Sequence, residues 1–216
     1  MKFKSLITAG AVAFLFIATG NAAIAAEEAR EVSAFNTVTL GGLGDLTITV
    51  GEEHSVVLEG DPRLLEKIET NVERGHLMIK RETRSWFSLN GENYGRLKVR
   101  VGVPELEKAM LAGSGNLEVK GLDGGETELA IAGSGHIKAQ GGLDVIRLVI
   151  NGSGEIEAEN LEVKDAHVTI NGSGDVLLRV AGELEATING SGDIEYIGEP
   201  ENVQSSMRGS GRIHQR

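Results

Sequence analysis

Residues 167–180, with the sequence HVTINGSGDVLLRV, contain the pattern that decides the fold. Apolar and polar residues alternate on both sides of a Gly-Ser-Gly tripeptide, and this period of two indicates strands with one buried face. The tripeptide occurs six times, and successive copies start 20, 19, 20, 18 and 19 residues apart. The copies span Gly113–Gly115, Gly133–Gly135, Gly152–Gly154, Gly172–Gly174, Gly190–Gly192 and Gly209–Gly211. So regular a period predicts a solenoid.

Each repeat is too small to fold alone. A unit of two short strands and two turns cannot bury its apolar face, whereas stacked units bury a continuous column. Equivalent strands then pair in parallel, about 4.8 Å apart. We therefore expect an all-β chain that forms a right-handed parallel β-helix with an aliphatic core. Asn151, Asn171 and Asn189 precede three consecutive Gly-Ser-Gly turns, and we expect them to stack as a ladder.

The serine of each turn has two interpretations. A hydrolase nucleophile occupies the third position of G-x-S-x-G between a strand and a helix, whereas here the glycines flank the serine directly. An active site also has no need of six copies. We therefore expect a stacked turn in which the hydroxyl bonds to the backbone, and no catalytic residue.

The first 25 residues have the order of a secretory signal peptide. A basic start at residues 2–4 precedes an apolar run at residues 6–17 and an A-x-A cleavage pattern at residues 23–25. The apolar run is short for a membrane span, which needs about 20 residues. We therefore expect cleavage near residue 25 and no stable membrane insertion afterwards. The protein is then expected in the periplasm, or secreted to the cell surface.

Charge and composition exclude several classes of function. The net charge of −11 becomes −13 when Lys2 and Lys4 leave with the signal peptide, and such a charge repels nucleic acid. The chain has no cysteine, and its five histidines lack the spacings typical of metal ligands. We therefore expect neither a metal centre nor another cofactor.

Acidic residues follow three consecutive turns, at Glu155, Asp175 and Asp193. A column of carboxylates is a possible calcium site. The same position in neighbouring repeats holds Asn, His or Arg, however, so the column is broken. A solvated surface is the preferred interpretation, and calcium binding is the alternative.

Residues 35–104 lack the tripeptide and are expected to form a cap, with residues 105–213 forming the coils of the same domain. Residues 41–44 look like a degenerate copy of the turn. Asp61 and Pro62 are typical of a helix start, and an apolar stripe up to Ile68 predicts a helix of two turns. Strands are expected at residues 46–50, 56–59, 76–80 and 97–103.

Three aromatic residues gather in a polar loop of this cap, at Trp86, Phe87 and Tyr94. One interpretation is a contact surface for a partner protein, a glycan or a lipid. The other is that these rings pack over the end of the column, and this interpretation is preferred because a cap needs bulky apolar groups.

Motifs across residues 35–213 resemble those of a known family. They are Leu64-Leu65-x-x-Ile68, Leu77-x-Ile79, Val101-x-Val103-Pro104-x-Leu106, the serial Gly-Ser-Gly turns, and Tyr196-x-Gly198-x-Pro200. In combination they resemble the bacterial putative auto-transporter adhesin, head GIN domain family, also called DUF2807. The resemblance implies an exported β-helical protein with no assigned catalytic residues.

Two classes of function remain. The first is an exported, non-catalytic module of the cell envelope, adhesin-like, that binds an envelope protein, a glycan or copies of itself. The second is a carbohydrate-active β-helix enzyme, a polysaccharide lyase or hydrolase, which needs paired carboxylates in an aromatic-walled groove. The outward residues of the coils include no aromatic residue, so the first class is preferred. Self-association is expected through the final unit, where Arg208, Arg212 and Arg216 make the end basic.

Overall fold

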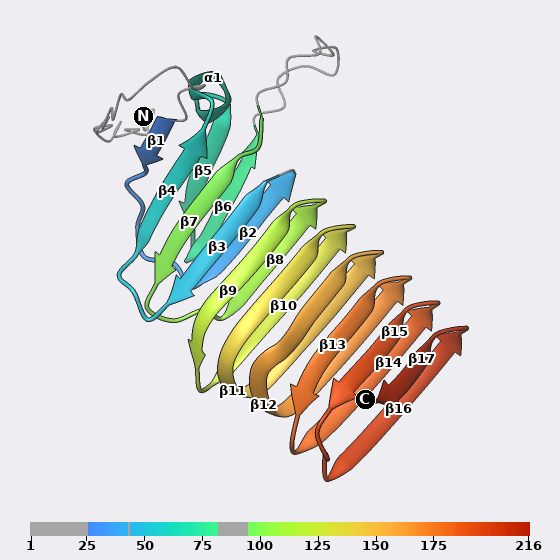
Figure 1. The fold of residues 1–216 in the computed structure, drawn as a ribbon. Coiled ribbons are helices and arrows are strands. Elements are labelled where there is room, and N and C mark those ends of the chain that lie inside the picture. Colours follow the sequence, from blue (N-terminus) through green and yellow to red (C-terminus); the bar gives the residue numbers. More distant parts are fainter. Residues whose placement is uncertain (1–25, 43, 82–94) are drawn as a thin grey trace, which may run out of the picture.

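The computed structural model describes residues 26–42, 44–81 and 95–216, which form a column of stacked β coils with a differently built cap at one end (Figure 1). The cap and the first coil contain β1 (Ala26–Ala29), β2 (Thr37–Gly42), β3 (Asp45–Val50), β4 (Ser55–Gly60), α1 (Pro62–Leu65), β5 (Ile68–Glu73), β6 (His76–Arg81) and β7 (Lys98–Val103). The following coils contain β8 (Lys108–Gly113), β9 (Asn116–Asp123), β10 (Glu126–Gly133), β11 (His136–Gly152), β12 (Glu155–Gly172), β13 (Asp175–Val180), β14 (Glu183–Gly190), β15 (Asp193–Ile197), β16 (Asn202–Gly209) and β17 (Arg212–Gln215).

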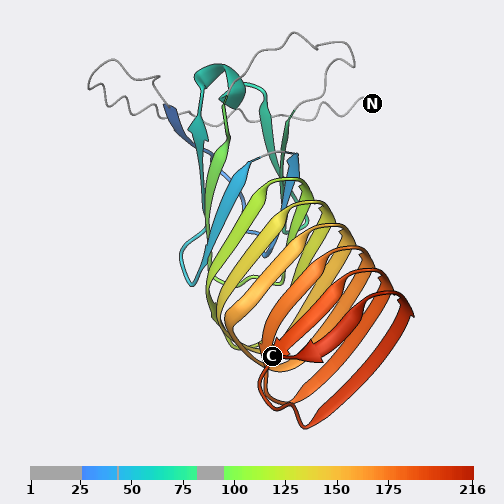
Figure 2. The ribbon, with the colours of Figure 1, turned by 45° about the vertical axis from the view of Figure 1, so that its right-hand side comes forward.

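Strands of successive coils pair in parallel, which confirms the predicted parallel β-helix (Figure 2). The register places equivalent residues of the repeat beside one another, as in the pairing of Gly133 with both Gly113 and Gly152. One detail of the prediction was wrong. β11 and β12 contain 17 and 18 residues and continue around a corner, where two separate strands were expected. Their corner residues also pair between coils, so hydrogen bonding does not stop at the bend.

The core consists of aliphatic columns that run through the stack. One column holds equivalent residues of successive coils, and all but the last are at most 1% exposed. Its members are Leu111, Ile131, Ile150, Ile170, Ile188 and Met207. Burial of such side chains stabilises each coil only through its neighbours, because a single coil is too thin to enclose them.

The Gly-Ser-Gly turns need glycine for two physical reasons. Gly172 has a φ of +140°, a conformation that residues with a side chain rarely adopt. A Cβ atom at this position would also overlap the carbonyl oxygen of Gly152 in the preceding coil. That oxygen accepts a hydrogen bond of 2.9 Å from the backbone N–H of Ser173. The close approach of successive backbones therefore explains the repeated tripeptide.

The serine hydroxyls of these turns do not form the hydrogen bonds to the backbone that were predicted. All six serines are exposed, and in the described part of the chain the contact between coils is made by their backbone N–H groups, without a hydrogen bond from the hydroxyl. The predicted Asn ladder is confirmed. The amide of Asn171 donates to Asn151 over 2.9 Å, and that of Asn189 donates to Asn171 over 2.9 Å.

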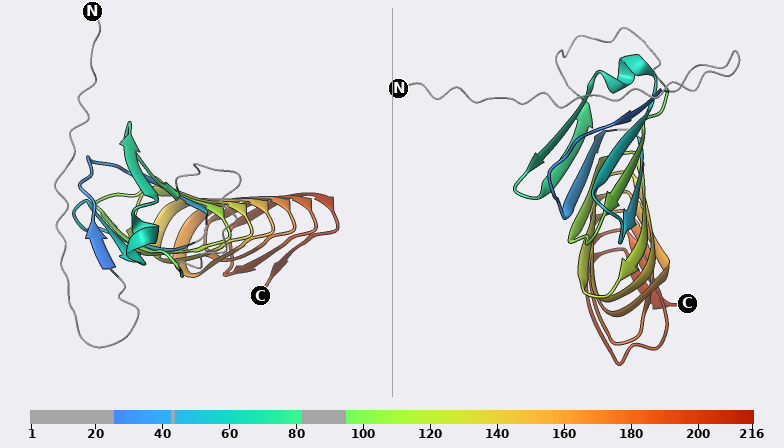
Figure 3. Two further views of the ribbon diagram at one scale, coloured as in Figure 1. Left: turned by 90° about the horizontal axis from the view of Figure 1, so that it is seen from above. Right: turned by 90° about the vertical axis from the view of Figure 1, so that its left-hand side faces the viewer.

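The cap departs from the coil pattern by adding antiparallel strands (Figure 3). β4 pairs antiparallel with β7, and β1 pairs with the far edge of β4. β5 pairs antiparallel with β6, which itself lies parallel to β2. β2 and β3 pair with β8 and β9 and so form the first coil, with Gly42 and Gly44 at the positions of the turn glycines.

The helix α1 is shorter than predicted. Asp61 caps it, because its carboxylate accepts a 2.9 Å hydrogen bond from the backbone N–H of Arg63. It ends after one turn, because Ile68, expected on its apolar stripe, is instead the first residue of β5. Leu64 and Leu65 are buried and close the column at this end. The predicted strands at residues 46–50, 56–59, 76–80 and 97–103 correspond to β3, β4, β6 and β7.

Candidate functional site

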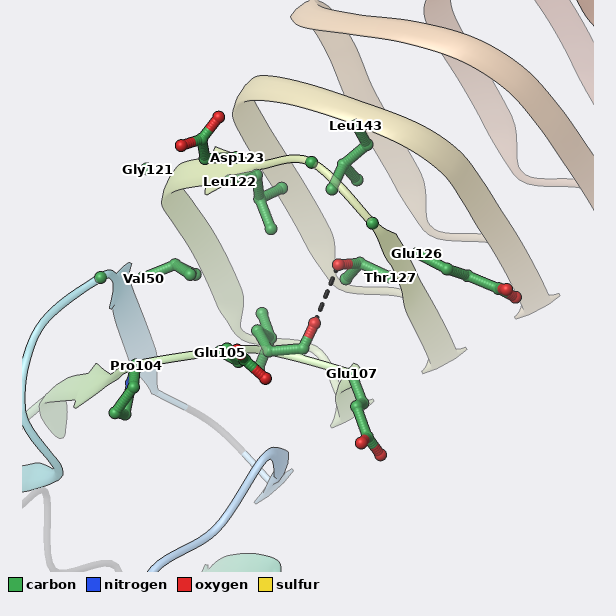
Figure 4. A pocket seen from close by; sticks show the side chains of 14 residues that line it. Val50, Pro104, Glu105, Glu107, Gly121, Leu122, Asp123, Glu126, Thr127 and Leu143 are labelled. Carbon is green, nitrogen blue, oxygen red and sulfur yellow. Dashed lines mark hydrogen bonds between the residues drawn. The ribbon is translucent and has the colours of Figure 1, made fainter.

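A hollow of about 510 Å³ lies where the cap joins the coils (Figure 4). One side is the segment from Pro104 to Glu107, through which the chain returns from the cap. The other side is the bend between β9 and β10, and Val50 and Leu143 complete the wall. The volume is within the range of about 300–1,000 Å³ that is typical of sites for small ligands or side chains.

The hollow exists because the coil pattern is interrupted here. The chain leaves the first coil after Val50, at the end of β3, and returns from the cap at Pro104, just after β7. In the next coil, the bend between β9 and β10 is made by Gly124 and Gly125, with φ values of +70° and +71°. A Cβ at either glycine would contact nothing within 4 Å. The lip of the hollow is therefore bare backbone beside open space.

The interior of the hollow is apolar. Leu106, Leu122 and Leu143 are 5%, 3% and 6% exposed, and they belong to three different segments. The side chains of Val50, Leu122 and Leu143 converge on the space (Figure 4). Thr127 is only 2% exposed, and its hydroxyl donates a 2.9 Å hydrogen bond to the carbonyl oxygen of Leu106. An apolar group can enter without leaving this hydroxyl unpaired.

The rim of the hollow is acidic. Glu105, Glu107 and Asp123 are exposed and form no ion pair with any residue that the structure describes. Glu126 is also exposed but is paired with Arg147 over 2.6 Å. The carboxylates spread around the opening, and no described lining residue is basic (Figure 4). The potential at the rim therefore favours a cationic group.

The polar side chains of the described lining are carboxylates and the hydroxyl of Thr127. The lining contains no serine, histidine, cysteine or lysine within the described ranges. It also contains no aromatic residue on which a sugar ring could stack. The arrangement can hold an apolar group and attract positive charge.

The aromatic residues predicted as a partner-binding loop, Trp86, Phe87 and Tyr94, lie outside the described residues. The hollow was not predicted from the sequence. A signal for it exists in the sequence, because Pro104 and the pair Gly124-Gly125 interrupt the repeat on both sides of one coil.

The acidic column is integrated into the coil surface. Glu155, Asp175 and Asp193 occupy equivalent positions of successive coils, as expected. The Asp175 carboxylate accepts a 3.0 Å hydrogen bond from the backbone N–H of Asp193. The side-chain hydrogen bond from Arg212 lowers the pKa of Asp193 below its ordinary value. These carboxylates thus already have partners within the stack.

Three histidines that are isolated in the sequence lie beside acidic residues of a neighbouring coil. His136 is 3.4 Å from both Glu155 and Glu157, and the three potential ligand atoms lie within 4.8 Å of one another. Lys138 competes for Glu157 at 2.7 Å. The other two pairs are His167 with Glu185 at 2.9 Å and His214 with Glu195 at 4.0 Å. Spacing along one strand cannot reveal such pairs, because the partners are 18 to 21 residues apart.

Within the described residues, α1 has only four residues, and no helix has the length and apolar character needed to cross a membrane. The fold is shared with several solved proteins. A putative adhesin from Bacteroides fragilis is 20% identical, with a TM-score of 0.71, over 88% of this chain and 96% of that chain. A putative adhesin from Parabacteroides distasonis is 19% identical, with a TM-score of 0.59, over 89% of this chain and 97% of that one.

A third solved structure, described as a putative lipid binding protein from Parabacteroides distasonis, is 22% identical, with a TM-score of 0.54, over 88% of this chain and 96% of that one. No curated protein matches the chain. A family model described as putative auto-transporter adhesin, head GIN domain, matches residues 34–200. Since this match covers most of the chain, the protein belongs to the head GIN domain family, DUF2807.

Proposed function

We propose that the protein is an exported, non-catalytic module of the cell envelope that binds a partner protein at the hollow between cap and coils. The observation that carries the proposal is the combination of an apolar interior with three unpaired carboxylates around the opening. The family description and the two similar structures named as putative adhesins support a binding role.

The chemistry of the hollow indicates what the partner presents. An apolar side chain fits the interior lined by Leu106, Leu122 and Leu143. Lysine or arginine residues beside it would meet Glu105, Glu107 and Asp123 at the rim. A protein segment with an apolar residue between basic residues provides both. A glycan is less suited, because the described lining offers no aromatic ring.

Export is supported by the order of the first 25 residues, in which a basic start, an apolar run and small residues follow one another. A protein without cysteine needs no disulfide chemistry after export. The periplasm and the cell surface are both compatible with this signal.

The test uses residues 26–216 as bait for envelope proteins, followed by affinity measurement with the captured protein. The triple variant Glu105→Lys, Glu107→Lys, Asp123→Lys reverses the rim charge. The matched control places the same three charge changes on exposed carboxylates that do not line the hollow, at Glu31, Glu66 and Glu183. We expect at least about tenfold weaker binding for the rim variant and unchanged binding for the control.

Three outcomes would contradict the proposal. Equal binding by the rim variant would remove the hollow as the site. Binding to neutral phospholipid vesicles instead of protein would assign the apolar interior to a lipid chain. Release of reducing sugar from any acidic polysaccharide would favour the carbohydrate-active enzyme.

A further inference from the structure

The last described coil leaves one edge of the column unpaired (Figure 1). β16 pairs with β14 on one side, and no described strand pairs with its other side. All eight residues of β16 are exposed. Backbone N–H and C=O groups along such an edge are free to pair with another strand.

This edge also exposes apolar side chains that belong to the core columns. Val203 and Met207 are 40% and 52% exposed, and they are the exposed large hydrophobic residues of the described chain. Their equivalents one coil earlier, Leu184 and Ile188, are each 1% exposed. A strand added to β16 would bury Val203 and Met207 as the earlier coils bury their counterparts.

The opposite end of the column has, among the described residues, no exposed large hydrophobic residue that could match Val203 and Met207. There the cap closes the core with α1 and the antiparallel strands, and Phe35, Leu64 and Leu65 are at most 6% exposed. Addition of copies head to tail, through the outer edge of β1 or β5, would therefore leave Val203 and Met207 without exposed apolar partners. Two copies can instead meet through the same edge, related by a two-fold axis.

The charges around β16 suit such a self-pairing. Glu199 and Glu201 precede the strand, and neither forms an ion pair with a described residue. Arg208 lies near its end, and its hydrogen bond is to the neutral Asn189, over 3.5 Å. The strand thus runs from an acidic start to a basic end. Antiparallel pairing of two identical strands brings each start to the other's end.

We propose that a second copy of this chain docks on the β16 edge, with the two β16 strands antiparallel and Ser205 facing itself across the two-fold axis. In this register Val203 of one copy faces Met207 of the other, so the apolar residues of both copies stay on the core side. Arg208 faces Asn202 and lies one residue from Glu201 of the other copy. This interface does not involve the hollow and stands independently of the proposed partner.

The test measures the mass of residues 26–216 by sedimentation equilibrium, with circular dichroism to verify folding. Wild type is expected to form a dimer. Glu201→Arg or Arg208→Glu alone places like charges together at both symmetric contacts, so we expect each variant to dimerise about tenfold more weakly. Lys164→Glu, a charge reversal at an exposed position outside the last coil, is expected to leave the dimer unchanged.

Mixing gives the sharpest outcome. When the two single variants are combined, every contact in the mixed dimer is again between opposite charges, so the mixture is expected to recover wild-type affinity. The double variant Glu201→Arg, Arg208→Glu is expected to recover it as well. The proposal would be overturned if the wild-type protein were a monomer at all concentrations and salt levels. It would also be overturned if Arg208→Glu left the dimerisation affinity unchanged. The rim variant of the hollow should dimerise normally, which separates the two proposals.

Discussion

Replacing Gly172 with alanine is expected to destabilise the coil far more than a change of one methyl group suggests. The φ of +140° at Gly172 is outside the regions that residues with a Cβ adopt, and such strain costs about 1–3 kcal/mol. The new Cβ would also overlap the carbonyl oxygen of Gly152 and lie 3.0 Å from its carbonyl carbon. Only separation of two successive coils relieves that overlap.

Separation of the coils weakens the hydrogen bonds that join them at this turn. Ser173 N–H donates to Gly152 over 2.9 Å, and Asp175 N–H donates to Gly154 over 3.1 Å. Each such bond contributes about 0.5–1.5 kcal/mol net. Together with the strain, the expected loss in the free energy of unfolding is about 2–6 kcal/mol. Urea denaturation of residues 26–216, followed by circular dichroism, measures this loss.

Two control substitutions separate the causes. Gly124 has a φ of +70° but no atom within 4 Å of a new Cβ, so Gly124→Ala carries only the conformational cost of about 1–2 kcal/mol. Ser173 is exposed and its hydroxyl bonds to no described residue, so Ser173→Ala should change stability by less than about 0.5 kcal/mol. If Gly172→Ala is no worse than Gly124→Ala, close backbone approach is not the reason for the repeated tripeptide.

Other predictions concern the core, the charges and export. In urea denaturation, Ile170→Ala should lower the free energy of unfolding by about 2–5 kcal/mol. Met207 belongs to the same column but is 52% exposed, so Met207→Ala should lower it by under about 1 kcal/mol in dilute protein. Equal losses for the two variants would refute the stacked core. Because Arg212 lowers the pKa of Asp193 from 3.8, the pair stabilises the fold above that pH and is lost at lower pH. Asp193→Asn should therefore lower the melting temperature at neutral pH, and the difference from wild type should vanish in acid. Calcium should leave the melting temperature unchanged. A rise in melting temperature would instead favour calcium binding by the acidic column. Residues 1–30 fused to a reporter that is active only after export should give activity, and Phe14→Asp should abolish it.

The sequence predicts the coils well because each position of the repeat is constrained by the coils on both sides. An apolar residue such as Ile150 packs between Ile131 and Ile170, so the period of the core is also the period of the sequence. The same logic predicts the ladder that joins Asn151 and Asn171. This reasoning fails for α1. Ile68, which was expected on a second helical turn, is instead the first residue of β5 and pairs with Arg81 of β6.

The long strands β11 and β12 show a second limit. The bend between their two halves contains Gly141 and Leu161, which lie between the two strands that were expected in each unit. In the structure these residues pair between the two coils, so the backbone bends without losing its hydrogen bonds. Whether a corner interrupts pairing depends on the match between neighbouring coils, and no single repeat contains that information.

The candidate site was harder to predict for a related reason. A perfect repeat buries its apolar face in the same way at every coil and leaves little space for a ligand. The hollow appears where one coil has a neighbour of a different kind, between Val50, Pro104 and the Gly124-Gly125 bend. The unpaired edge at β16 likewise arises where the stack meets no further described coil. In a chain built from near-identical units, a distinctive binding surface therefore requires a break in the pattern, and such breaks are the first places to test for function.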